Sequence, residues 1–129
     1  MHGRYLLDTN ILIAVLNNEA AVLRRVSTVS ELLISVISVG ELLRGAYGSH
    51  RVESNLHRVR GMAVRMPVIP CTLATAESYA RIKHGLRSKG RPVPDNDIWI
   101  AATAQQQGLV LATRDRHFRE IEELRIEEW

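Results

Sequence analysis

Short apolar runs alternate with longer helix-patterned segments along the chain. RYLLD, LLISVIS, MPVIP and LVLAT predict strands, and the continuous apolar runs in LLISVIS and LVLAT are typical of strands buried on both faces of a parallel sheet. Between them, apolar residues recur every three or four positions, which predicts amphipathic helices. These include helices over residues 19–27, 51–66 and 72–89. The predicted order is β-α-α-β-α-α-β-α-α-β, with LRIEEW as a last edge strand or tail, and it indicates an α/β protein with a mostly parallel sheet.

Residues 92–115, PVPDNDIWIAATAQQQGLVLATRD, show this organisation most clearly. Two prolines restrict the backbone ahead of a helix, and the DND sequence at 95–97 supplies side chains that can cap its N-terminus. From 98 to 104 all residues but one are apolar, so this helix must be covered on several sides. Gly108 ends it, and the buried strand that follows has Asp115 at its carboxyl end, where sites form in open α/β sheets.

Polar residues predict where two earlier helices begin. Thr9 or Asn10 can cap the helix that follows the first strand, and Asp8 can fill the same role. The sequence SVGE, which starts at Ser38 and ends in Glu41, matches the capping box S-x-x-E, in which the glutamate folds back to the helix N-terminus. Glu41 would then lie in the first turn, from where it can equally point into a site at the carboxyl edge of the sheet.

Length and composition predict one domain over residues 1–129. The hydrophobic content of 46% is ordinary for a globular protein. The single cysteine, Cys71, cannot form an internal disulfide, which fits the reducing cytoplasm and predicts a small buried filler. No apolar stretch reaches the roughly 18 to 20 residues that span a bilayer, and the first residues lack a signal-peptide pattern. We therefore expect a soluble cytoplasmic protein with no membrane contact.

The charge pattern is compatible with a polyanionic partner but does not require one. The formal net charge is +3, and because only Lys83 and Lys89 are lysines among the 17 basic residues, fifteen are arginines. Arginine suits bidentate phosphate contacts, although a GC-rich genome produces the same bias. None of the five histidines, His117 included, has a paired spacing such as H-x-x-x-H, so a histidine metal site is not supported. Glycine-rich phosphate loops are absent as well.

The acidic residues point to the chemistry. Every aspartate follows a predicted strand or begins a predicted helix, whereas the glutamates lie mostly on helical segments; the aspartates are Asp8, Asp95, Asp97 and Asp115. Capping preferences explain part of this placement. Carboxylates brought to one sheet edge repel by roughly 4 kcal/mol for a pair about 4 Å apart at an effective dielectric near 20. Mg²⁺ or Mn²⁺ would relieve that repulsion, and two such ions can activate a water and stabilise the leaving oxygen of a phosphodiester.

Four sequence blocks, in this order and spacing, resemble the signatures of PIN domains. They are LLDTN with Asp8, ISVISVGELLRGA with Glu41, PDNDIWIAATA with Asp97 and LVLATRD with Asp115. The chain is more closely similar to the VapC-type toxins of bacterial toxin–antitoxin pairs. Four matched blocks in one short chain are specific, and the resemblance spans nearly all of it.

This resemblance implies a Rossmann-like three-layer α/β/α sandwich with a four- or five-stranded sheet, and an endoribonuclease that depends on Mg²⁺ or Mn²⁺. The matching catalytic and metal-binding acids are Asp8, Glu41, Asp97 and Asp115. Asn10 and Thr113 match supporting polar positions, and Asp95 is expected to cap its helix, with a supporting role as the alternative. The resemblance also implies a homodimer and a small antitoxin protein, whose segment occupies a groove near the active site and would help to cover the apolar helix at 98–104.

Three other functions stay open at this point. A receiver-like phosphoacceptor domain also binds Mg²⁺ in an acidic cluster, but it needs a lysine after the last strand, where this chain has Arg114. A catalytically idle module would use the same fold to bind nucleic acid or protein, and the intact acids count against it. A structure-specific DNA nuclease would need a long arch or extra helices, for which the chain has no room.

Overall fold

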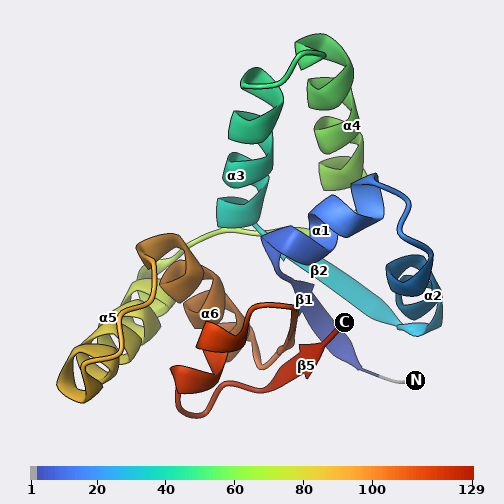
Figure 1. Cartoon of the computed structure of the whole chain (residues 1–129). Helices are drawn as coiled ribbons and strands as arrows, with labels where there is room; N and C mark the ends of the chain where they lie inside the picture. Colours follow the sequence, from blue (N-terminus) through green and yellow to red (C-terminus); the bar gives the residue numbers. More distant parts are fainter. Residues whose placement is uncertain (1–2) are drawn as a thin grey trace.

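Five parallel strands form a single sheet in the order β3-β2-β1-β4-β5. The computed structural model describes residues 3–129; Met1 and His2 lie outside the described residues. The strands are β1 (Arg4–Leu7), β2 (Glu31–Ser35), β3 (Val68–Ile69), β4 (Val110–Thr113) and β5 (Ile126–Glu128). The chain builds outward from β1 to β3 and then crosses to β4 on the other side of β1, so the direction of winding reverses there. Figure 1 shows β2 on one side of β1 and β5 on the other. The 124–129 segment is thus an edge strand, one of the two predicted alternatives.

Helices cover both faces of this sheet. They are α1 (Thr9–Leu16), α2 (Ala20–Thr28), α3 (Val36–Tyr47), α4 (Val52–Arg65), α5 (Leu73–Lys89) and α6 (Asp95–Gln107), followed by the 3-10 helix η1 (Arg116–Glu120). The first four helices pack on one face, and α5 and α6 pack on the other. The predicted three-layer α/β/α sandwich is therefore confirmed, and α2, α4 and α5 lie where the helical spacing predicted them.

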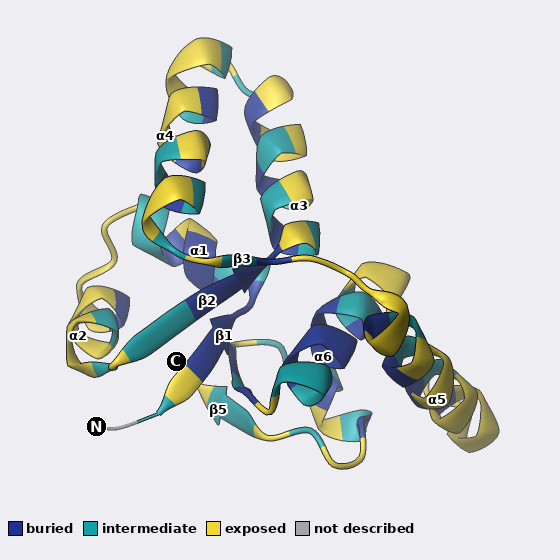
Figure 2. Ribbon diagram, turned by 180° about the vertical axis from the view of Figure 1, so that it is seen from behind, coloured by how far each residue is buried: buried dark blue, intermediate teal, exposed yellow. Residues whose placement is uncertain are grey.

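Neighbouring residues of the central strand face opposite layers. Leu6 joins the hydrophobic cluster of α5 and α6, whereas Leu7 joins that of α1 to α4, and both side chains are fully buried. Helix α6 lies between the sheet and α5, which buries residues 98–104 except for the half-buried Trp99, whereas Asp95 and Asn96 at its start are exposed (Figure 2). Its apolar sequence is thus covered within the chain, as the continuous pattern predicted. A covering antitoxin is not needed to explain it.

The predicted start of α3 is wrong. The strand ends at Ser35, three residues earlier than predicted, and Ser35 caps the helix by accepting hydrogen bonds from the backbone amides of Ile37 at 2.9 Å and Ser38 at 3.3 Å. Ser38 therefore lies inside the first turn and is buried rather than acting as a cap. Glu41 lies in the second turn, so it forms no capping box.

The caps of the other two helices have different outcomes. Helix α1 begins at Thr9 with Asp8 as its cap, one of the predicted alternatives, because the Asp8 carboxylate accepts the Thr9 amide hydrogen bond. Helix α6 begins directly after Pro94 with no side-chain cap, so the capping role expected of Asp95 is wrong. At its other end, Gly108 adopts the left-handed conformation with φ of 66° and ends α6 as predicted.

Two expectations from composition have different outcomes. Cys71 is exposed, not a buried filler, because it lies in the surface connection between β3 and α5. Within residues 3–129, no helix combines the length and apolar character that a bilayer crossing requires.

Candidate active site

Four acidic side chains meet at the carboxyl edge of the sheet, beside the reversal between β1 and β4. Asp8 follows β1, Asp115 follows β4, Asp97 lies in the first turn of α6, and Glu41 projects from the second turn of α3. They are close enough to interact electrostatically: the charges of Glu41 and Asp97 act on Asp8, and those of Glu41 and Asp115 act on Asp97. The structure thus brings together the four acids that the sequence singled out.

Asp8 is the most deeply placed of these acids, with 4% of its surface exposed. Its Oδ1 accepts a hydrogen bond from the Thr9 amide at 2.8 Å, and its Oδ2 accepts one from the Thr113 hydroxyl at 2.7 Å. Burial raises the pKa of Asp8 to about 6, and repulsion from Asp97 and Glu41 adds to this effect while the two hydrogen bonds oppose it. The site therefore carries negative charge that the protein only partly compensates.

Glu41 is held by hydrogen-bond donors from two other helices. Its Oε1 accepts a hydrogen bond from the Thr9 hydroxyl at 2.7 Å, and that hydroxyl also contacts the Ser38 hydroxyl at 2.9 Å. The amide of Asn96, at the start of α6, donates to Oε2 at 3.4 Å. Helices α1, α3 and α6 thus fix the direction of this carboxylate, which supports a role in the site rather than at the helix terminus.

His117 joins the other two acids and was missed in the sequence. Its Nε2 lies 2.7 Å from Asp97 Oδ2, and its Nδ1 lies 2.8 Å from Asp115 Oδ1. One potential ligand atom from each of these three residues falls within 4.8 Å of the others. Burial raises the pKa of Asp97, whereas its contact with His117 lowers it. The pattern considered in the sequence was a pair of histidines. His117 has no such pair, because it is a single histidine two residues after Asp115 at the end of β4.

The three predicted supporting residues behave differently from one another. Thr113 bridges two acids, because its hydroxyl donates to Asp8 and accepts the Asp115 amide hydrogen bond at 3.0 Å. The side-chain oxygen of Asn10 is buried and has no hydrogen-bond partner within the described chain. Asp95 points toward α5, where it accepts hydrogen bonds from Lys83 at 2.5 Å and from the Tyr79 hydroxyl at 3.0 Å. Its carboxylate joins α6 to α5 instead of facing the four acids.

The donor set fits a hard divalent cation. Such ions prefer several carboxylate oxygens, and the pKa values of both Asp8 and Asp97 are raised by burial, as expected for acids without a full positive counter-charge. The unpartnered acceptor oxygen of Asn10 is a further group that an ordered water or cation could satisfy. Fold and site together define a class of α/β proteins with a carboxylate cation site at the point where the strand order reverses.

Comparisons with known proteins agree with this class. A family model for the PIN domain matches residues 5–124. Ribonuclease VapC1 of Haemophilus influenzae is 32% identical over 130 residues, which cover 97% of both chains. The tRNA(fMet)-specific endonuclease VapC of Shigella flexneri is 33% identical over 129 residues and 98% of both chains. The solved structure of DNA-bound VapBC from Salmonella typhimurium has a TM-score of 0.90 and 35% identity, with 98% of both chains covered.

The chain therefore belongs to the PIN-domain family, and its relatives place it in the VapC group. This confirms the resemblance carried by the four sequence blocks.

Proposed function

We propose that the chain is a divalent-metal-dependent endoribonuclease that acts as the toxin of a type II toxin–antitoxin pair. The observation that carries this proposal is the convergence of Asp8, Glu41, Asp97 and Asp115 in a PIN-domain chain whose relatives are named ribonucleases. A cluster of partly uncompensated carboxylates suits Mg²⁺ or Mn²⁺, and these ions in turn suit phosphodiester chemistry.

Each acidic residue has a role in this proposal. Asp8, Asp97 and Asp115 would supply the oxygens that hold the cation or cations, with Glu41 completing the set. When bound, the cations would activate a water for attack on phosphorus and stabilise the leaving oxygen. No covalent protein nucleophile is then required.

Neighbouring residues keep these acids in place before substrate arrives. Thr113 holds Oδ2 of Asp8, and Thr9 holds Oε1 of Glu41. His117 spans Asp97 and Asp115, which limits the separation of two carboxylates that would otherwise repel each other. Such prior ordering lowers the cost of arranging ligands and substrate in the reaction.

The residue that follows β4 argues against the receiver-like alternative. Such a domain needs a lysine there, but this chain has Arg114, which is paired with Glu19 at 2.6 Å. The intact and ordered acids likewise favour catalysis over an idle binding module.

A groove beside the site suits the antitoxin segment. It lies between α1, α3 and α4, has a volume of about 260 Å³, and is lined by both Glu41 and Ile13, which is 46% exposed. An antitoxin segment in this groove would reach the active-site acids and obstruct RNA. The relative from Salmonella typhimurium was solved as VapBC. Homodimer formation and the choice between Mg²⁺ and Mn²⁺ stay predictions.

Metal-dependent cleavage of RNA tests the proposed function. Total RNA is incubated with the wild type, Asp8→Asn or Asp97→Asn, in Mg²⁺, in Mn²⁺ or in EDTA, and fragment ends are mapped. We expect discrete fragments only for the wild type with metal, while the matched control Asp95→Asn keeps cleaving because its side chain faces α5. Cleavage that persists in EDTA, or that survives in Asp97→Asn, would contradict the proposal.

A further inference from the structure

A basic segment precedes the acidic site in the sequence. Residues 78–94 contain five arginines and lysines and no acidic residue, and they cover most of α5 and the loop that enters α6. The mild net charge of the whole chain conceals this local excess. Whether the excess can attract a polyanion depends on which of these cations already have acidic partners.

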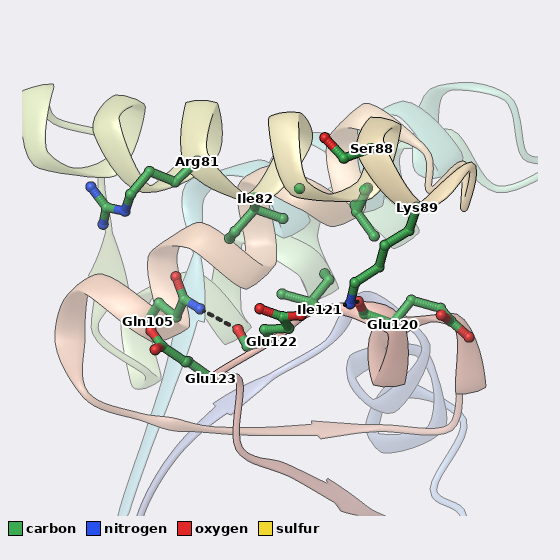
Figure 3. Close-up of a pocket in the computed structure, with 11 residues that line it drawn as sticks. Arg81, Ile82, Ser88, Lys89, Gln105, Glu120, Ile121, Glu122 and Glu123 are labelled. Atoms are coloured by element: carbon green, nitrogen blue, oxygen red, sulfur yellow. Dashed lines mark hydrogen bonds and ion pairs between the residues drawn. The ribbon is translucent and has the colours of Figure 1, made fainter.

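One side of α5 is neutralised by the chain itself. There, a cavity of about 390 Å³ lies between α5 and the segment at 120–123, and Glu120, Glu122 and Glu123 line it together with Arg81 and Lys89 (Figure 3). Lys89 pairs with Glu122 at 3.1 Å and donates to the backbone oxygen of Glu120 at 3.2 Å. This mixed-charge side offers little attraction for a polyanion.

The neighbouring side of α5 keeps part of its positive charge: Lys83 is already paired with Asp95 at 2.5 Å, so the remaining charge comes from Arg87 and Arg91. Two hollows of about 540 and 340 Å³ adjoin there and share Lys83 and Arg87, and Arg91 lines the second of them. Arg87 is exposed, and no ion pair joins it to an acid among residues 3–129. The contact of Arg91 with Glu120 is long, 3.8 Å, and the Arg91 side chain is 64% exposed, so this contact competes weakly with a phosphate.

This surface leads directly to the candidate active site. Lys83 is bonded to Asp95, and the two residues after Asp95 are Asn96, which donates to Glu41, and Asp97 itself. Lys83 and Arg87 are one helical turn apart, about 6 Å along α5. A bound strand could therefore follow α5 and enter the acidic cluster at the start of α6.

We propose that Arg87 and Arg91, beside the Asp95-paired Lys83, form a phosphate-binding surface, the α5 cationic surface, for the RNA strand that leads to the four acids. The inference rests on the proposed ribonuclease function and adds where its substrate binds. The arginines offer planar, charged donor groups that match phosphate oxygens. Contacts of this kind position the nucleic acid without reading its sequence. They would also offset the repulsion between RNA phosphates and the acidic site.

The inference is tested by removing positive charge at this surface and, separately, far from it. Arg87→Ala, Arg91→Ala and the double variant are compared with Arg24→Ala, which removes an exposed arginine on α2, near the amino edge of the sheet. Binding of a fluorescent single-stranded RNA is measured at several salt concentrations in the cleavage-deficient Asp97→Asn background. KM and kcat for RNA cleavage are measured with Asp97 intact.

We expect the double variant to bind RNA on the order of tenfold more weakly and to raise KM more than it lowers kcat. The slope of the logarithm of RNA affinity against the logarithm of salt concentration should decrease in magnitude by about 0.7 for each phosphate contact that is lost. A DNA strand of the same sequence should lose affinity to the same extent, and Arg87→Lys should recover part of it, because both follow from phosphate contacts. Arg24→Ala should bind as the wild type does.

Two results would overturn the inference. One is a double variant whose RNA affinity and KM equal those of Arg24→Ala. The other is a double variant whose RNA binding depends on salt as strongly as that of the wild type. If the wild type cleaves RNA and the double variant retains its affinity, the proposed function stands and the surface serves another partner, such as an acidic protein segment. If the wild type fails to cleave with any metal but the double variant loses RNA affinity, the ribonuclease proposal fails and the RNA-binding surface stands.

Discussion

Replacing Asp8 with asparagine should stabilise the metal-free protein at alkaline pH. Shifting the pKa of this carboxyl from its ordinary value of 3.8 to about 6 corresponds to about 3 kcal/mol of lost stability when the group is ionised. Asparagine caps helices as well as aspartate does, so the bond from the Thr9 amide is kept. The bond from Thr113 must reverse or break, at a cost of about 1 kcal/mol. The expected net gain is about 1 to 2 kcal/mol.

The pH dependence gives this prediction a definite sign. Above the folded-state pKa of about 6, Asp8 is ionised in both states and the folded protein carries the full penalty. Between pH 6 and 3.8 the folded state takes up the proton first, so the penalty decreases, and below 3.8 it is absent. The advantage of Asp8→Asn over the wild type should therefore be largest near pH 8 and should have disappeared by about pH 4.

Urea unfolding in EDTA, followed by tryptophan fluorescence at pH 8 and pH 4, measures this difference in unfolding free energy. The control is Asp95→Asn: because the pKa of Asp95 is lowered, chiefly by its hydrogen bond with Lys83, its ionised form favours folding and the variant should gain nothing at pH 8. An Asp8→Asn protein that is less stable than the wild type at pH 8 would refute the reasoning. It would show that Asp8 serves mainly as a helix cap.

Three further predictions concern metal, positioning and backbone. Saturation with Mg²⁺ at about 100 times its dissociation constant should stabilise the wild type by about 2.7 kcal/mol and leave Asp8→Asn unchanged, measured by thermal unfolding with and without EDTA. Thr9→Val should lower kcat for RNA cleavage by about tenfold, because Glu41 loses the hydroxyl donor. Thr9→Ser keeps a hydroxyl and should retain the wild-type kcat. Equal activity of the wild type and both variants would exclude this positioning role. Gly108→Ala should lower the free energy of unfolding by about 1 kcal/mol, because the φ of Gly108 is 66°. Gly85→Ala inside α5 should raise the free energy of unfolding by about 0.5 to 1 kcal/mol, because open space surrounds the added Cβ. Chemical denaturation of the two variants measures both changes.

The hydrophobic pattern was sufficient to predict the layers of the fold, but it did not predict the exact helix starts. Buried strands and amphipathic helices have different periods, so their order can be read locally. A cap depends on which of several nearby polar groups receives the amide hydrogen bonds. Ser35 and Ser38 were both suitable for α3, and the end of the strand decided for Ser35. Pro94 already fixes the start of α6, which leaves Asp95 free to pair with Lys83.

The acidic cluster was predictable because parallel strands bring their carboxyl ends to one edge. That rule gives the meeting place of Asp8 and Asp115 without any knowledge of side-chain contacts, and Asp97 joins them because α6 runs from this edge back to the start of β4. It does not give the partners that hold them. His117 reaches two acids only because η1 turns the chain back directly after β4, and no spacing of ligand residues indicates such a turn.

The hydrogen bond between Asp8 and Thr113 joins residues 105 positions apart. During translation, the first of these groups leaves the ribosome long before the second has been synthesised. Until β4 docks beside β1, a nascent chain lacks Thr113 and Asp115 at the carboxyl edge of its incomplete sheet. The full set of four acids therefore comes together only in a chain that has been synthesised beyond β4.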